Sequence, residues 1–259
     1  MDPERFQKLR AALRQTEQQG IGTLGEKTLH GLLKAYFQPD PACQEVAVGS
    51  FVADAVRDDG IIEIQTRSLY RLRTKLQYYL PLYPVTVVYP VAAIKWLIWV
   101  NESGECSPRR KSSRSPQGGQ VLAELYGLRD LLTHPHFHLC VILLEVEDYR
   151  LLNGWSRDRK RGSTRFDRVP LSLLGEIWIR SPEEYWKLLP PDLPMPFTAG
   201  ELGKAVGLSQ KKASLGANVL WTLGTVQRVG KRGNAYLYTI KTNQPSAADP
   251  SPVPVEKET

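Results

Sequence analysis

Cysteine is scarce in this chain of 259 residues: Cys43, Cys106 and Cys140 are odd in number and widely separated. Disulfide-stabilised secreted domains and zinc sites built from paired cysteines both need thiols at closer, regular spacing. The cysteine content therefore argues against both classes. It favours the reducing cytoplasm over secretion.

Long apolar runs are also missing. The first twenty residues, MDPERFQKLRAALRQTEQQG, are charged and lack the apolar core of a signal peptide. The most apolar stretch, VTVVYPVAAIKWLIWV at 85–100, is too short to cross a bilayer and is interrupted by Pro90 and Lys95. We expect a cytoplasmic protein with no membrane partner.

The remaining composition is that of an ordinary globular protein, with 42% hydrophobic and 24% charged residues. The length allows one large domain or two smaller ones, with enough residues for a real core. The formal net charge is +7, which is compatible with an acidic partner such as nucleic acid but does not identify one.

Apolar periodicity predicts an α/β domain over residues 1–190. The expected helices cover 3–18, 24–37, 68–80 and 120–133, and the expected strands cover 46–56, 61–66, 85–89, 94–100, 138–152 and 176–180. Loops are expected at 101–119 and 156–170. The proline-rich stretch 190–196 is typical of a domain linker, and the tail at 242–259 has the composition of a disordered segment.

The stretch DAVRDDGIIEIQT, which begins at Asp54, places acids inside apolar strands. An Asp-Gly pair between two such strands is a strong hairpin signal, because a type I′ turn needs positive φ at both central residues. If Asp59 and Gly60 form the turn, Asp54 faces Gln65 and is a diagonal neighbour of Glu63. Both acids then lie on one face, within reach of a shared ion.

A third acid comes from the preceding helix. Glu26 falls in line with Leu29, Leu33 and Phe37 on the core-facing stripe, where an unpaired carboxylate is costly. Three converging acids repel each other unless a hard cation such as Mg²⁺ binds between them. Each acid taken alone has a simpler interpretation, as a solvent-facing residue on the wet face of an antiparallel sheet.

Together these residues resemble the PD-(D/E)XK nuclease superfamily over roughly residues 20–100, and GEKTLH…VADAV…GIIEIQT is also similar to a group of uncharacterised bacterial proteins of that superfamily. The resemblance implies a restriction-endonuclease-like mixed sheet flanked by helices. It also implies that Glu26, Asp54 and Glu63 hold Mg²⁺ or Mn²⁺, and that DNA is the substrate. Many such nucleases act as dimers, so a homodimer remains an open alternative.

Gln65 departs from the family, which usually has lysine there. Glutamine can hydrogen-bond the attacking water but supplies no charge. Some related families move the lysine to the following helix, and Lys75 is the candidate for that role; the alternative is a solvated surface lysine. Arg71 and Arg73 are weaker candidates. His30 either assists proton transfer, holds Glu26, or is an ordinary core histidine.

Three further histidines alternate in THPHFH, which ends at His138. A zinc cluster is one interpretation. A junction between a loop and a strand fits the neighbouring Pro135 better.

Residues 197–241 form a second unit. Thr198 and Glu201 have the spacing of a capping box, a second helix is expected at 209–223 with Ser209 as its cap, and TVQRVGKRGNAYLYTI predicts a hairpin. Two helices followed by a hairpin resemble a winged helix-turn-helix. Seven basic residues stand against Glu201 alone: Lys204, Lys211, Lys212, Arg228, Lys231, Arg232 and Lys241.

The winged-helix resemblance implies DNA contacts from Lys211, Lys212 and Asn218 on the recognition helix and from Lys231 and Arg232 on the wing. Such units also serve as protein-docking or dimerisation modules. Three functions therefore remain open: a Mg²⁺-dependent DNA endonuclease, a DNA-binding regulator with an inactive nuclease-like domain, and a protein-interaction module.

Overall fold

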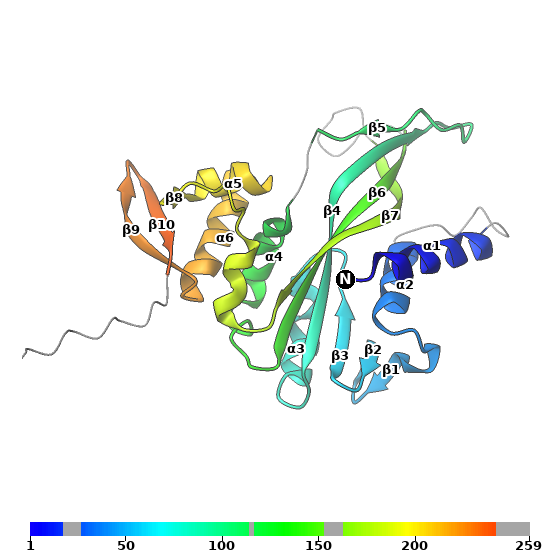
Figure 1. The fold of residues 1–259 in the computed structure, drawn as a ribbon, viewed down its shortest axis with the longest axis horizontal. Helices are drawn as coiled ribbons and strands as arrows, with labels where there is room; N and C mark the ends of the chain where they lie inside the picture. The colour runs from blue at the N-terminus through cyan, green and yellow to red at the C-terminus, as the bar shows by residue number, and fades with distance from the viewer. Residues whose placement is uncertain (18–26, 114–116, 153–162, 242–259) are drawn as a thin grey trace, which may run out of the picture.

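A computed structural model describes residues 1–17, 27–113, 117–152 and 163–241 (Figure 1). Glu26 lies outside these residues, as do the expected start of the second helix, part of the basic loop at 156–170 and the tail from 242 onward.

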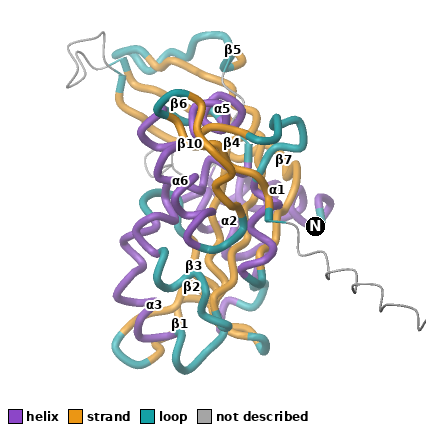
Figure 2. Tube along the Cα trace, turned by 90° about the vertical axis from the view of Figure 1, so that its left-hand side faces the viewer, coloured by secondary structure: helices purple, strands orange, loops and turns teal. Residues whose placement is uncertain are grey.

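The centre of the fold is a mixed sheet with the order β1-β2-β3-β4-β6-β7, in which a short β5 also pairs with β4. Its strands are β1 (Gln44–Val48), β2 (Phe51–Arg57), β3 (Gly60–Ile64), β4 (Val85–Val100), β5 (Arg110–Lys111), β6 (Phe137–Leu151) and β7 (Thr164–Ile179). β4 is parallel to both β3 and β6, and the other pairs are antiparallel. The long strands β4, β6 and β7 run the length of this sheet, with β1 at one end of the molecule and β5 at the other (Figures 1 and 2).

Helices cover both faces of the sheet, which confirms the expected α/β class. α1 (Pro3–Glu17) and α2 (Lys27–Phe37) lie on one face, where Leu33 packs with Ile62 and Ile142. α3 (Arg73–Tyr79) and α4 (Leu122–Leu125) lie on the other, where Leu76 packs with Val87. Figure 1 shows the two layers on opposite sides of the sheet.

Several predicted boundaries were wrong. The expected strand 46–56 is two strands joined at Gly49, whose φ of 59° permits a tight turn. The expected helix 68–80 begins as a 3₁₀ turn at Leu69–Leu72. Of the expected helix 120–133, only α4 is α-helical, between 3₁₀ turns at Gly118–Val121 and Tyr126–Leu128. The last strand is far longer than 176–180.

β4 is one strand rather than the expected two at 85–89 and 94–100. The carbonyl of Val88 accepts from the amide of Gln65 (2.9 Å), so Val88 directs its backbone polar groups toward β3. Pro90, two residues on, points its nitrogen the same way, but β3 has ended at Ile64. The missing N–H therefore costs no ladder hydrogen bond, and the strand continues.

The C-terminal unit contains the two expected helices and the hairpin. Its elements are β8 (Phe197–Thr198), α5 (Ala199–Val206), α6 (Gln210–Thr222), β9 (Val226–Arg232) and β10 (Ala235–Ile240), and the three strands form a sheet with the order β8-β10-β9. The Thr198–Glu201 capping box is present, and α5 ends at Gly207 with φ 74°. Ser209 is at the N-cap position of α6, although its side chain does not make the capping hydrogen bond.

This unit shares its core with the large sheet. Leu202, Val206 and Leu220 belong to the same apolar cluster as Leu122 and Val87. Gly216 allows α6 to approach α4 closely, because a Cβ at this position would lie 3.0 Å from Leu122 Cβ. The stretch 190–196, expected as a linker, buries Leu193 in the same cluster.

Candidate functional site

The hairpin that carries the acids has a different register from the expected one. Arg57 pairs with Gly60 and Ala55 pairs with Ile62, so Asp58 and Asp59 form the turn. The expected Asp59-Gly60 turn was wrong, as was the pairing of Asp54 with Gln65. Gly60 has φ 135° and begins β3, where a Cβ would collide with the carbonyl oxygen of Pro84. One residue beyond the Ala55–Ile62 pair, this register sets Asp54 directly beside Glu63.

Asp54 is held by two hydrogen-bond donors. Its Oδ2 accepts from the amide of Ile64 (2.7 Å) and lies 3.3 Å from Nε2 of His30 on α2. Burial by itself would raise the pKa of Asp54, but the His30 and Ile64 contacts outweigh it and the pKa is lowered. Asp54 is therefore an anion at neutral pH. The contact that His30 makes is with this carboxylate.

Glu63 is the most deeply buried acid of the site, with 1% of its surface exposed. Its Oε2 accepts from Lys75 Nζ (2.6 Å), while Oε1 is buried and has no hydrogen-bond partner among the described residues. Burial, followed by the charge of Asp54, raises the pKa of Glu63 to about 7 against the opposing effect of Lys75. An unpartnered carboxylate oxygen at this depth is a place where a cation would fit.

Lys75 reaches the acids from α3. Its side chain is 17% exposed and lies over the ring of Tyr79 (5.9 Å to the centroid), so it is not the solvated surface lysine of the simpler interpretation. Arg73 instead forms a bidentate pair with Asp130 (2.7 and 2.6 Å). Arg71 is exposed on the preceding 3₁₀ turn. Of these three cations, Lys75 is the one that joins the site.

Gln65 follows directly after β3. Its side-chain Nε2 donates to the carbonyl of Ser68 (2.8 Å), and its backbone amide donates to Val88. The glutamine therefore stabilises the turn that leads into α3.

The metal set predicted from sequence is present only in part within the described residues. Asp54 and Glu63 are adjacent, but Glu26 lies outside those residues, so its place beside them stays a prediction. Where the chain is described, no group of three or more histidine, cysteine or acidic side chains is arranged to hold a metal ion. The carboxylate pair and the unpartnered Glu63 Oε1 nevertheless suit an oxygen-preferring cation such as Mg²⁺ or Mn²⁺.

The histidines of THPHFH have other partners. His134 and His136 lie with ring centroids 5.4 Å apart, and His136 Nδ1 is 2.8 Å from the carbonyl oxygen of Leu80. His138 lies on β6, which begins at Phe137. The residues form a loop-to-strand junction, as the sequence favoured.

The predicted DNA-contacting residues differ in their immediate contacts. Lys211 is exposed and Asn218 is half-buried on the same stripe of α6, whereas Lys212 faces Glu124 of α4 (3.8 Å). Lys231 lies over the ring of Tyr236 (5.0 Å), and Arg232 donates to Glu201 (2.7 Å).

Sequence reasoning missed Arg228 as an individual contact. Its guanidinium lies over the rings of Trp221 (3.9 Å) and Tyr236 (4.0 Å), two exposed aromatic residues. One sequence signal could have indicated this contact. A tryptophan near the end of the second helix of the C-terminal unit is followed by the alternating Tyr-x-Tyr of β10.

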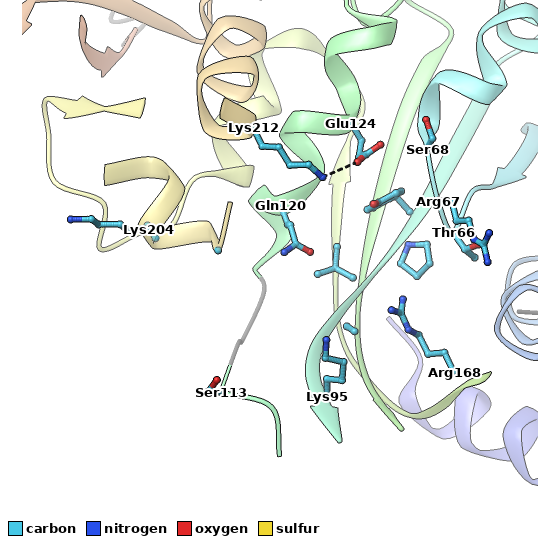
Figure 3. Close-up of a pocket in the computed structure, with 16 residues that line it drawn as sticks. Thr66, Arg67, Ser68, Lys95, Ser113, Gln120, Glu124, Arg168, Lys204 and Lys212 are labelled. Atoms are coloured by element: carbon cyan, nitrogen blue, oxygen red, sulfur yellow. Dashed lines mark ion pairs between the residues drawn. The ribbon is translucent and has the colours of Figure 1, made fainter. Parts of the chain in front are cut away.

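A polar cleft of about 740 Å³ was also missed (Figure 3). It opens between the middle of β4 and the helices α5 and α6, and its charged lining comprises Arg67, Lys95, Glu124, Arg168, Lys204 and Lys212. These cations come from segments far apart in the sequence, so no local pattern indicates that they meet.

Residues 27–180 match the family model described as a domain of unknown function, DUF8091. The chain belongs to the DUF8091 family. A protein of Treponema pallidum (strain Nichols), described as uncharacterised, is 31% identical over 241 residues, which cover 90% of this chain and 92% of the relative. No solved structure matches the chain.

The DUF8091 match includes Asp54, Glu63 and Lys75 and ends before α5. The similarity to the Treponema protein is longer than that domain, so it extends beyond the sheet. No helix within the described part of the DUF8091 chain is long and apolar enough to cross a membrane.

Proposed function

We propose that this DUF8091 chain is a metal-dependent endonuclease that hydrolyses phosphodiester bonds in DNA, with a restriction-endonuclease-like sheet and a winged-helix unit that binds the substrate. The meeting of Asp54, Glu63 and Lys75 carries the proposal. Two acids from neighbouring strands and a lysine from the next helix are brought together, Glu63 buried and the other two half-buried. Charged groups clustered away from solvent in this way are typical of functional sites.

The acids suit a hard divalent cation. Asp54 and Glu63 would hold Mg²⁺ or Mn²⁺, with Glu26 in support, and Glu63 Oε1 offers an oxygen that has no other described partner. When bound, such a cation supplies a Lewis acid that activates water and offsets the charge developing on the phosphate.

The protein's own groups would position the reactants. Lys75 places a positive charge beside the acids, where it can stabilise the phosphate in the transition state. His30 orients the Asp54 carboxylate through their 3.3 Å contact. Gln65 can accept a hydrogen bond from the attacking water through its side-chain carbonyl, although it cannot supply a charge.

The C-terminal unit provides a surface suited to duplex DNA. Lys211 and Asn218 share a stripe of α6 with the exposed Trp221, and Arg228 stacks on that tryptophan. Lysine and arginine contacts to phosphate position a duplex, and an amide side chain can read a base edge. The opposite side of α6 packs on α4, so the stripe faces away from that contact.

A DNA-binding regulator without nuclease activity is the second candidate. One contact favours it: Lys75 pairs with Glu63 at 2.6 Å, and this positive charge stabilises the acid without a metal ion. Gln65 in place of the usual lysine points the same way. A protein-interaction module is a third, weaker candidate, and salt-independent behaviour toward DNA would favour it.

The deciding experiment is incubation of the purified protein with plasmid, single-stranded and branched DNA in Mg²⁺, Mn²⁺ or EDTA. Glu63→Ala is compared with Asp58→Asn, an exposed acid in the turn of the same hairpin. Cleavage that needs the metal, survives in Asp58→Asn and disappears in a folded Glu63→Ala variant supports the nuclease. Cleavage unchanged by Glu63→Ala defeats it, and salt-sensitive binding without cleavage supports the regulator.

A further inference from the structure

The polar cleft has a strongly positive lining. Arg67, Lys95, Arg168, Lys204 and Lys212 stand against Glu124, which pairs with Lys212 at 3.8 Å. Figure 3 shows Lys95 and Arg168 on the strand side and Lys212 reaching in from α6 on the other. A concave site with one sign of charge concentrates a ligand of the opposite sign. The expected ligand is therefore an anion.

The cleft and the candidate catalytic site are linked by strand β4. Glu63 pairs with Val87 across the parallel β3–β4 ladder, so these residues lie on the same face of the sheet. Tyr89 and Val91 continue that face along β4 and line the cleft. Tyr89 is thus only about 7 Å further along the strand than the level of Glu63. A chain-like anion lying in the cleft would therefore point along this face toward the strands that carry the acids.

The cations on the strand side are held by the sheet. Arg168 pairs with Asp148 in the β6–β7 ladder, and its guanidinium lies 3.8 Å from the fully buried carboxylate of that residue. Lys95 is on β4, opposite Val146 of β6. A guanidinium held like that of Arg168 binds phosphate with little loss of conformational freedom. Tyr89 adds an aromatic side chain to the lining of the cleft.

The size of the cleft selects among nucleic acids. Its volume of about 740 Å³ is in the range that encloses one small ligand, which is too little for a length of duplex but enough for a short piece of single strand. A positive groove with an aromatic side chain is also the combination that single-strand-binding proteins use.

We infer that this cleft holds an unpaired DNA strand, with its phosphates against Arg67, Lys95 and Arg168, and guides it to Asp54 and Glu63. The inference rests on the proposed nuclease function. It specifies the substrate as DNA with a single-stranded part, such as a frayed or branched end, whose duplex part lies on the exposed stripe of α6.

The test is binding in EDTA, where metal-dependent cleavage is blocked. A labelled fifteen-residue oligothymidylate and a hairpin duplex are titrated by fluorescence anisotropy with wild type, Lys95→Ala, Lys204→Ala and Lys8→Ala. Lys8 is an exposed lysine of α1, on the face of the sheet opposite α3, and is the matched control. Lys204 is exposed on α5, so its removal leaves no buried group unpaired and gives a second variant should Lys95→Ala fail to fold.

Lys95→Ala and Lys204→Ala are each expected to weaken single-strand binding by roughly fivefold to tenfold at low salt, and to reduce the slope of log affinity against log salt by about 0.7. Lys8→Ala should bind as wild type does. Single-strand affinity unchanged in both cleft variants overturns the inference, as does an equal loss in Lys8→Ala.

Cleavage assays separate this inference from the proposed function. Specific single-strand binding in the cleft without metal-dependent cleavage supports the cleft and overturns the nuclease. Metal-dependent cleavage by wild type that Lys95→Ala and Lys204→Ala leave unchanged on branched DNA supports the nuclease and overturns the cleft.

Discussion

Lys75 Nζ donates to Glu63 Oε2 over 2.6 Å, and this contact joins helix α3 to the middle strands of the sheet at a point where the glutamate is almost fully buried. The pair accounts for one oxygen of Glu63 and leaves the other without a described partner. It therefore governs both how stable the site is and what the site can bind.

Removing the lysine should destabilise the protein in a pH-dependent way. In Lys75→Met the buried glutamate loses its cation, which costs about 1–3 kcal/mol of unfolding free energy where Glu63 is ionised. Below the pKa of about 7 the glutamate is protonated, and the loss should be small. Urea denaturation at pH 5.5 and pH 8.5 measures the difference, with Lys75→Arg as the charge-preserving control. Equal losses at the two pH values would contradict the assignment.

The raised pKa of Glu63 makes a prediction for the wild type without metal. Ionisation is harder in the folded protein, where the pKa is about 7, than in the unfolded chain, where it is 4.5. The stabilisation is thus complete below pH 4.5 and is lost as the pH rises through about 7. In EDTA we expect the unfolding free energy to fall by about 2–3 kcal/mol between pH 5 and pH 8. Glu63→Gln should flatten this decline, and an equally steep decline in the variant would show that another group causes it.

Divalent cations should reverse that trend. A bound cation needs ionised carboxylates, so Mg²⁺ or Mn²⁺ should stabilise the protein more at pH 8 than at pH 5.5. At a concentration one hundred times the dissociation constant, the gain is about 2.7 kcal/mol. Thermal unfolding with and without the metal measures it, and Asp54→Asn should abolish the gain whereas Asp58→Asn keeps it. A shift that both variants retain would place the cation elsewhere.

The capping box of α5 should matter for the whole chain. Thr198 Oγ1 accepts from the amide of Glu201, and the Glu201 carboxylate accepts from the amide of Thr198. Thr198→Ala should lower the unfolding free energy by about 1 kcal/mol, and Thr198→Ser should retain most of it. Because α5 shares its core with the sheet, the loss should appear in one cooperative transition. A separate early transition would mean that the C-terminal unit unfolds independently.

The sequence located the acids but not their pairing. Alternation and apolar content placed Asp54 and Glu63 on neighbouring strands, because those signals are local. The register depended on which residues make the turn, and the collision that a side chain at Gly60 would have with Pro84 comes from a segment some twenty residues away. The turn preference of a short sequence contains no information about that contact.

Lys75 and the cleft show the same difference between local sequence signals and contacts made by distant segments. Helical spacing did not show whether Lys75 points toward the site or toward solvent. The packing of α3 on the sheet turns it toward Glu63. Arg168 and Lys95 belong to strands whose pairing brings them near α5 and α6 only in three dimensions. Interactions of this kind depend on tertiary packing, so periodicity and motif spacing do not reveal them.

The close approach of α6 to α4 at Gly216 fixes the position of α6 relative to the large sheet. Because α6 packs this closely in a core continuous with the sheet, the stripe of Lys211 and Asn218 is held in place relative to the acids on β2 and β3. The separation between those two surfaces is then a fixed length. For the nuclease proposed above, this fixed length predicts cleavage at a constant distance from the duplex bound by α6.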